Sequence, residues 1–321
     1  MTSADEQGAN ISGGAPALSN TDILRTLAEF VGEHFLFFAS VSRSWRESWS
    51  PERPKMTRLV TSDYASVSQL MDGFECDMPR DRPGLCSALA RLGRIELLQC
   101  AHEHGCVWDA GTCASAAAGG HLVVLQWARQ HGCDWDKLTC FCAAKGGHLA
   151  TLQWARRNDC PWGIMTCSAA ARGGHLETLQ WARLHDCPWN AETCAAAAEG
   201  GHLALLQWAR QKGCAWDKMA CCGAASGGHL SVLEWARQNG CPWDYWTCAK
   251  AAAGGHLEVL QWARRNECPW NEATCRAAAR EGHLEVLEWA RYNGCPWRKS
   301  ICLSSAVSRR HQRVVEWIQG N

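Results

Sequence analysis

The sequence predicts an all-α solenoid of stacked helix pairs, because three of its features repeat together. The chain of 321 residues holds 21 Cys and 19 Trp, and both residue types recur with a step of 27 residues. The series run over Cys86–Cys302, Cys106–Cys295, Trp108–Trp297 and Trp127–Trp289. Between them an Ala-rich stretch alternates with an amphipathic one, each of about ten residues. A period of about 20–50 residues built from two such stretches is typical of stacked helical repeats.

The overall composition is that of a folded, soluble chain. Hydrophobic residues make up 47% and charged residues 20% of the sequence, and 32 basic residues balance 32 acidic ones. This balance provides no basic face for nucleic acid, and no run of about eighteen apolar residues predicts a membrane span. The first residues lack the basic end and apolar stretch of a signal peptide. We therefore expect a cytoplasmic protein, with the nucleus as a second compartment, and no contact with nucleic acid or membrane.

Four segments follow one another along the chain. Residues 1–17, rich in Gly, Ser and Ala, are predicted to form a disordered N-terminal tail. Residues 18–50 carry apolar positions at helical spacing and predict a small helical segment. Residues 51–85 contain four Pro and predict a connecting segment or a degenerate repeat. Residues 86–321 are predicted to hold eight units of 27 residues and a C-terminal capping half-unit.

Each unit is predicted to form two helices, the first of which is short and rich in Ala. In the unit around Cys194, the Ala body stops at Gly200-Gly201, a pair suited to a left-handed cap. In six units an Asp or Asn precedes this helix, where its side-chain oxygen would accept from free amides of the first turn. These predicted caps are Asp109, Asp136, Asn190, Asp217, Asp244 and Asn271.

The second helix is amphipathic and closes the unit. It is predicted to begin near His202 and to end at Gly213, and the stripe that faces the stack is predicted to hold Leu203, Leu206, Trp208 and Ala209. Neither helix buries its apolar side alone, since isolated helices of fewer than about 12–15 residues are marginal in water. Copies must therefore stack, each unit should contact only its neighbours, and the terminal units are expected to act as caps.

The unit resembles the ankyrin repeat. The match is carried by residues 193–208, TCAAAAEGGHLALLQW, and residues 278–294, AAREGHLEVLEWARYNG, and the resemblance covers residues 86–319. Ankyrin repeats are usually about 33 residues long, and the missing residues fall after the second helix, where ankyrins place a β-hairpin finger. Here the finger shrinks to Cys-Pro-Trp followed by Asp or Asn. The resemblance implies an ankyrin-like helical-repeat solenoid whose surface binds other proteins.

Residues 18–50 resemble an F-box. The resemblance rests on a Leu-rich first helix and on the closing run VSRSWR at residues 41–46. It implies docking to a Skp-type adaptor of a cullin ubiquitin ligase, with the repeats selecting the substrate. The adaptor-binding residues would be Leu18, Ile23, Leu24, Leu27, Leu36, Val41 and Trp45. The alternative is a helical cap that closes the first repeat.

The many cysteines and histidines raise the question of a metal site, which their spacing disfavours. Corresponding residues in neighbouring units lie about 8–10 Å apart, whereas the ligands of one zinc lie about 2.0–2.3 Å from the metal. A pair such as Cys133 and Cys140 could approach, yet two ligands make an incomplete site. We therefore expect reduced, buried thiols that pack as small hydrophobes, and no metal or cofactor. A thiol-rich metal or redox protein is the less favoured alternative.

The His that opens each second helix predicts a structural contact rather than catalysis. From His121 to His283 it stands where a ring nitrogen could satisfy a loop carbonyl or a free amide. The Trp of the second helix is expected in the core, and the Trp of the turn between units. No phosphate-binding loop, nucleophile elbow or carboxylate dyad interrupts the pattern. The chain is therefore predicted to be non-enzymatic.

Function is expected where the units differ, because a structural position repeats while a recognition position varies. Three columns vary, namely the residue after the leading Cys, the end of the first helix and its start. The predicted partner-binding residues in them are Phe141, Lys145, Arg172, Tyr245, Trp246, Arg276 and Arg280. The hypothesis is a monomeric protein-interaction scaffold whose first helices contact a partner protein. Neutral variation of the surface is the alternative.

Overall fold

The structure, a computed structural model, describes residues 84–321. In that range it contains eighteen helices and no strand, which confirms the prediction of an all-α helical-repeat solenoid. None of these helices is both long and apolar enough to cross a membrane. The elements predicted for residues 1–83, including the F-box-like segment, lie outside the described residues.

Each unit contributes two helices, and the first has an odd number and the second an even one. The first helices are α5 (Leu85–Arg91), α7 (Ala110–Ala118), α9 (Lys137–Lys145), α11 (Ile164–Arg172), α13 (Ala191–Glu199), α15 (Lys218–Gly227), α17 (Tyr245–Ala253), α19 (Glu272–Glu281) and α21 (Lys299–Ser308). The second helices are α6 (Ile95–Glu103), α8 (Leu122–Gln130), α10 (Leu149–Arg157), α12 (Leu176–Leu184), α14 (Leu203–Gln211), α16 (Leu230–Gln238), α18 (Leu257–Arg265), α20 (Leu284–Tyr292) and α22 (Gln312–Gly320).

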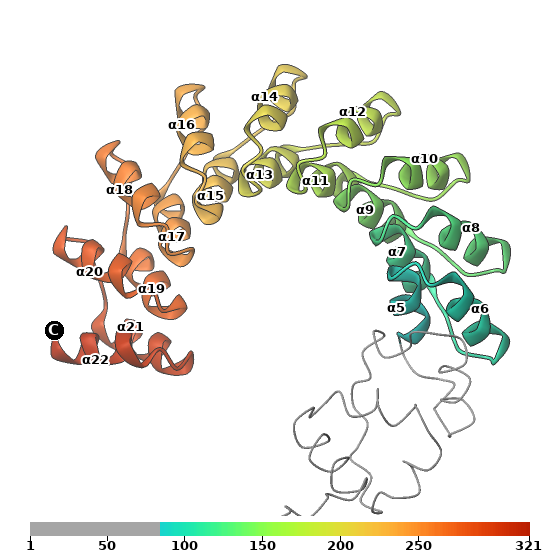
Figure 1. The fold of residues 1–321 in the computed structure, drawn as a ribbon. Coiled ribbons are helices and arrows are strands. Elements are labelled where there is room, and N and C mark those ends of the chain that lie inside the picture. The colour runs from blue at the N-terminus through green and yellow to red at the C-terminus, as the bar shows by residue number, and fades with distance from the viewer. Residues whose placement is uncertain (1–83) are drawn as a thin grey trace, which may run out of the picture.

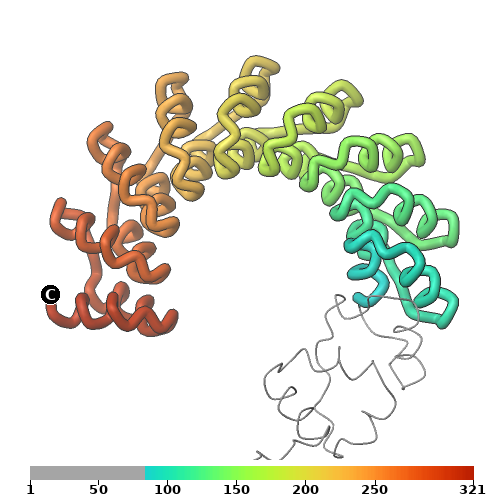
Figure 2. The backbone as a smooth tube through the Cα atoms, in the orientation of Figure 1, coloured from blue at the N-terminus to red at the C-terminus, as the bar shows by residue number. Residues whose placement is uncertain are grey.

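The two kinds of helix form two layers of an arc. Figures 1 and 2 show the first helices on the inner, concave side and the second helices on the outer side. Neighbouring first helices contact one another along the whole stack, whereas neighbouring second helices barely touch. The Ala body of the first helix explains the difference, because the distance between packed helices depends on the side chains at their contact. A tight inner layer and a looser outer layer bend the stack.

The first helix begins as predicted. Asp109 is the N-cap of α7, and its Oδ1 accepts from the amide of Gly111 at 2.9 Å. The structure shows the same bond at the other predicted caps, Asp136, Asn190, Asp217, Asp244 and Asn271. Among the inner first helices the exception is α11, where Gly163 occupies the N-cap and supplies no side-chain acceptor, and the terminal helices α5 and α21 also lack a side-chain cap.

The first helix ends at the glycine pair. Gly200 keeps a right-handed conformation with a φ of −79°, and Gly201 takes a left-handed one with a φ of +77°. The left-handed cap predicted for this pair therefore resides at its second member, where a side chain would be strained. The amide of His202 then donates to the carbonyl of Ala197 at 2.9 Å, and α14 begins one residue after the predicted start.

One continuous apolar core runs between the layers. Its largest fully buried side chains include one Leu from each central second helix, namely Leu125, Leu152, Leu179, Leu206, Leu233, Leu260 and Leu287. In α14 the buried side chains are Leu205, Leu206 and Ala209, whereas Leu203 and Trp208 are only half-buried. Leu206 and Ala209 of the predicted stripe are thus in the core, and Leu203 and Trp208 pack against it. Trp208 also meets Trp189 edge to face, at 5.8 Å between ring centroids.

The C-terminal end of the stack is the helix pair α21 and α22. Its first helix has Arg298 at the N-cap and so lacks the side-chain cap of the inner units.

Candidate functional site

The histidines join neighbouring units. His148 Nε2 lies 3.1 Å from the carbonyl oxygen of Ala118, the last residue of the preceding first helix. Because a carbonyl only accepts, this nitrogen carries the proton and donates. The ring lies against Gly120 of the preceding unit and Gly146 of its own, since a Cβ at either glycine would come within 2.5 Å of it. The prediction that His satisfies a carbonyl is confirmed, and the acceptor belongs to the neighbouring unit.

The outer layer is held by an Arg and two Trp in each central unit. The Arg210 guanidinium lies over the ring of Trp216, 4.4 Å from its centroid, and Nη1 donates to the carbonyl of Cys214. Trp216 in turn meets Trp235 of the next unit edge to face, at 5.7 Å between centroids. The same Arg–Trp contact recurs at Trp135, Trp162, Trp189, Trp243, Trp270 and Trp297. The prediction that the turn Trp packs between units is confirmed.

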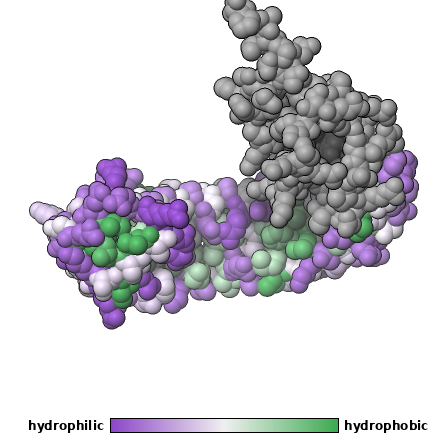
Figure 3. Space-filling model, turned by 90° about the horizontal axis from the view of Figure 1, so that it is seen from below, coloured by the Kyte–Doolittle hydropathy of each residue, from purple (hydrophilic) through white to green (hydrophobic). Residues whose placement is uncertain are grey.

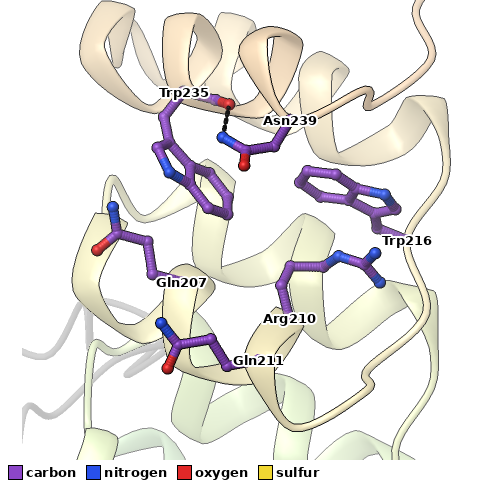
Figure 4. A pocket seen from close by; sticks show the side chains of 6 residues that line it. All are labelled: Gln207, Arg210, Gln211, Trp216, Trp235 and Asn239. Carbon is purple, nitrogen blue, oxygen red and sulfur yellow. Dashed lines mark hydrogen bonds between the residues drawn. The ribbon is translucent and has the colours of Figure 1, made fainter.

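A cavity opens between α14 and α16 on the outer side (Figure 4). It measures about 480 Å³ and is lined by Gln207, Arg210, Gln211, Trp216, Trp235 and Asn239. Most of this lining is already engaged, because Arg210 and Trp216 hold the contacts just described and Asn239 Nδ2 donates to the Trp235 carbonyl at 2.8 Å. The cavity therefore follows from the spacing of the second helices and supplies no group specific to one unit.

The described cysteines are free thiols, and all are buried except the half-buried Cys142. The leading cysteine and the turn cysteine of the same unit interact with each other, as Cys113 and Cys133 do. Hydrogen bonding to Cys133, with burial, raises the pKa of Cys113, and the same bond lowers the pKa of Cys133. Cys133 Sγ also donates to the carbonyl of Asp109 at 3.2 Å.

Within residues 84–321, no group of three or more His, Cys, Asp or Glu side chains is arranged to hold a metal ion. The thiols instead fill space beside Ala and Leu in the core. Their hydrogen bonds run to backbone carbonyls of the same or the preceding turn. In this region the cysteines are therefore part of the packed core.

The concave face is formed by one stripe of each first helix. On α9 it consists of Leu138, Phe141, Cys142 and Lys145, at the spacing of a single helix face. Leu138 and Lys145 are exposed, whereas Phe141 is half-buried and packs against the core. The ends of the stripe therefore meet solvent, and its middle forms a floor between neighbouring helices.

Large apolar side chains line the starts of the first helices. Leu138, Met165, Met219 and Trp246 are 49%, 46%, 48% and 40% exposed, and we call these four the apolar row. Figure 3 looks into the concave side and shows hydrophobic patches there among hydrophilic ones. Neighbouring first helices stack side by side, so the row extends along the arc from α9 to α17. It is interrupted at α13, where Glu192 occupies the same position.

Cationic side chains line the ends of the first helices. Arg91, Lys145, Arg172 and Arg280 are all exposed, and we call them the cationic row. Two further exposed cations, Lys250 on α17 and Arg276 on α19, lie about one turn closer to the helix starts on the same face.

The floor between the two rows is made of small residues. Ala114, Ser168, Cys222 and Ala249 are buried there, so half of the variable column after the leading Cys is shielded by packing. At Gly223 a Cβ would lie 2.6 Å from the carbonyl oxygen of Ala195. The middle of the concave face is therefore occupied by small side chains at these positions.

The structure brings most of the predicted partner-binding residues to this face. Lys145, Arg172, Trp246, Arg276 and Arg280 are exposed, and Phe141 and Tyr245 are half-buried. The predicted adaptor-binding residues lie outside the described residues.

Sequence reasoning did not select Leu138, Met165, Met219 or Lys250 as site residues. The sequence signal for these residues was a large or charged side chain at positions where other units carry a small residue or Glu. In comparisons with known proteins, no family model matches the chain and no curated protein matches it.

Proposed function

We propose that this chain is a non-enzymatic protein-interaction scaffold whose concave face holds a partner protein. The observation that carries the proposal is the apolar row, because four large apolar side chains are exposed along one face of a chain that has a continuous core for such residues. Exposed apolar patches on soluble proteins mark interaction sites. The repeated residues, in contrast, are engaged in holding the units together.

The proposal includes an ankyrin-like architecture with a shortened connection. It is supported by the Gly-His-Leu motif and by the two-helix unit, in which the segment from Cys-Pro-Trp to the next helix contains no strand within residues 84–321. A cytoplasmic location is supported by the free, buried thiols, since reducing compartments keep thiols in that form. A monomer is expected, since one chain builds the whole face.

Affinity capture with the full chain tests this proposal. One variant combines Met165→Ser with Lys145→Glu on the concave face, and its control combines Leu184→Ser with Arg157→Glu on second helices, where both residues are exposed. We expect wild type and control to capture the same proteins and the concave variant to lose them. Capture of the same proteins by all three would exclude the concave face.

A second candidate is a substrate receptor of a cullin ubiquitin ligase. It is favoured by the VSRSWR run at residues 41–46 and by the Leu-rich stretch before it. The test is co-purification of a Skp-type adaptor with the full chain. The double variant Ile23→Ala with Trp45→Ala should abolish co-purification while leaving capture through the concave face unchanged. Capture of the adaptor by the double variant as well as by the wild type would count against this role.

A further inference from the structure

We infer that the segment held on the concave face is an acidic stretch of polypeptide that carries large apolar side chains. This inference rests on the proposed function and specifies the chemistry of the partner. It follows from the placement of the apolar row, the cationic side chains and the floor between them.

The two rows run side by side along the arc. On α9, Leu138 and Lys145 stand at opposite ends of the same exposed stripe, and seven residues of helix separate them by about 10 Å. A segment that lies across the first helices thus meets apolar side chains along one edge and positive charges along the other. An amphipathic segment with an acidic side matches both edges at once.

The charge of the face differs from that of the whole chain. The full sequence has a formal net charge of zero, yet on the concave stripes the cations outnumber the acids. The cations are Arg91, Lys145, Arg172, Lys250, Arg276 and Arg280, and the acids are Glu192 and Glu199. This local excess attracts an acidic partner and repels a basic one.

Part of this charge is not neutralised within the described chain. Arg172 pairs with Glu199, and Arg280 Nε lies 3.3 Å from Glu281 Oε1. For Lys145, Lys250 and Arg276, no ion pair forms within residues 84–321. These three cations therefore remain available for carboxylates of a partner.

The floor allows the partner backbone to come close. Ala195 and Ala249 form it together with Gly223, which has no Cβ between α13 and α15. A partner backbone that lies there would place its apolar side chains against the apolar row and its acidic side chains against the cationic row. Burial of apolar side chains would supply affinity, and the cations would set the preference for acidic sequences.

Fluorescence anisotropy with three synthetic probes tests the inference on the full, reduced chain. The probes are labelled 21-residue peptides of equal length, one of Glu with Leu and Phe, one of Lys with Leu and Phe, and one of Glu with Ser. We expect the Glu-Leu-Phe peptide to bind at least tenfold more tightly than either of the others. Its affinity should fall as salt is raised, because salt screens exposed charges.

Two double variants separate the contributions of the rows. Lys145→Glu with Arg276→Glu should weaken binding of the Glu-Leu-Phe peptide at least tenfold and strengthen binding of the Lys-Leu-Phe peptide. Met165→Ser with Met219→Ser should weaken both apolar peptides. The matched controls, Arg157→Glu with Arg265→Glu and the single change Leu184→Ser, alter exposed second-helix residues and should leave every affinity unchanged. Circular dichroism and melting temperatures show whether each variant is folded.

Several outcomes would overturn the inference. It fails if the Glu-Leu-Phe and Lys-Leu-Phe peptides bind with equal affinity, or if the Glu-Leu-Phe peptide does not bind. It also fails if the charge reversal leaves the affinities unchanged in a folded variant. If the concave variant loses its captured proteins while no acidic probe binds, the scaffold function stands and this inference fails. Sedimentation that shows a dimer dissociated by Met165→Ser would instead identify a second copy of the chain as the occupant.

Discussion

At the scale of single residues, a few side chains close the hydrogen bonds that a short helix leaves open. Asp109 accepts from the first turn of α7, Gly201 turns the chain at the end of α13, and Arg210 donates to the carbonyl of Cys214 after α14. Each of these positions is filled by the same chemistry in most units. The units that deviate allow the contribution of each residue to the free energy of unfolding to be tested.

Gly163→Asp should stabilise the protein. Gly163 stands at the N-cap of α11 in an extended conformation with a φ of −164°, and nothing lies within 4 Å of the place its Cβ would take. An Asp there restores the missing acceptor and lowers the entropy of the unfolded chain, which together contribute about 0.5–1 kcal/mol. Urea unfolding of both proteins measures the gain. Gly163→Ala is the control, because it changes the entropy without adding an acceptor.

Glu267→Gly should also stabilise the protein. Glu267 has a φ of +63° after α18, where most other units place a glycine. Left-handed backbone costs a residue with a Cβ about 1–2 kcal/mol, and the greater freedom of glycine in the unfolded chain offsets part of this, so a net gain of about 0.5–1 kcal/mol is expected. Asp186→Gly, at a φ of +61°, should gain less, because Asp tolerates this conformation better. A larger gain at Asp186 in thermal unfolding would contradict this explanation.

Stability should fall at alkaline pH. Burial raises the pKa of Cys86 from 9.0 to about 12, with smaller contributions from Cys106 and Cys133, and burial also raises the pKa of Cys302. A raised pKa in the folded state means that the unfolded chain ionises first, so stability is complete below pH 9 and is lost as pH rises toward 12. Urea midpoints with reductant should be lower at pH 10.5 than at pH 8, and Cys86→Ala should reduce the difference. An equal pH effect in that variant would argue against a contribution from Cys86.

At the scale of helices, neighbouring units are joined by a histidine ring that lies between the backbones of the two units. His148 reaches the end of α7 while its ring covers Gly120 and Gly146. Because the inner helices are Ala-rich and close together, the junction has room for one imidazole and for no additional Cβ. The glycine pair and the histidine therefore recur together in the sequence.

A double-mutant cycle tests this coupling. In Gly146→Ala the new Cβ would come within 2.5 Å of the His148 ring, while the backbone at Gly146 has a φ of −85°, which Ala adopts without strain. We expect overpacking to lower the free energy of unfolding by about 1–3 kcal/mol. His148→Ala should lower it by a similar amount, because the carbonyl of Ala118 loses its hydrogen-bond donor. The double variant should lose at least about 1 kcal/mol less than the sum. Additive losses in urea unfolding would contradict the proposed contact.

At the scale of the whole molecule, the arc has a continuous core but only neighbour contacts. First helices touch the first helices on either side and their own second helices. Stability of such a chain is the sum of unit and interface contributions, so damage at one interface should remain local. The same arrangement forms the concave face, because each unit supplies at most one residue to the apolar row and one to the cationic row.

Gly223→Ala tests this locality. The added Cβ would lie 2.6 Å from the carbonyl oxygen of Ala195 and should push α15 away from α13. Native-state hydrogen exchange should accelerate in α13 to α16 and remain unchanged in α5 to α8 and α19 to α22. Uniform acceleration across residues 84–321 would show instead that the arc unfolds as one unit.

Local features were predictable from the sequence alone. The 27-residue period, the two helices of each unit and the caps at Asp109 and its equivalents depend on neighbouring residues, so pattern and spacing predict them. The left-handed glycine and the structural role of His follow the same logic. For the site, the period separated repeated residues from varying ones and thereby directed attention to Lys145, Arg172 and Arg280.

The remaining features depended on how one unit is placed against the next, and the sequence of a single unit does not contain that rotation. Stacking decided that His148 bonds the preceding unit and that Trp208 meets Trp189 of the preceding connection. It also decided which varying side chains are exposed, shielding Phe141 while leaving Met165 in solvent. What the sequence determined by itself is therefore the unit, because helices and caps are local. Only the tertiary structure decided the concave face, because a surface shared by many units exists only once they are stacked.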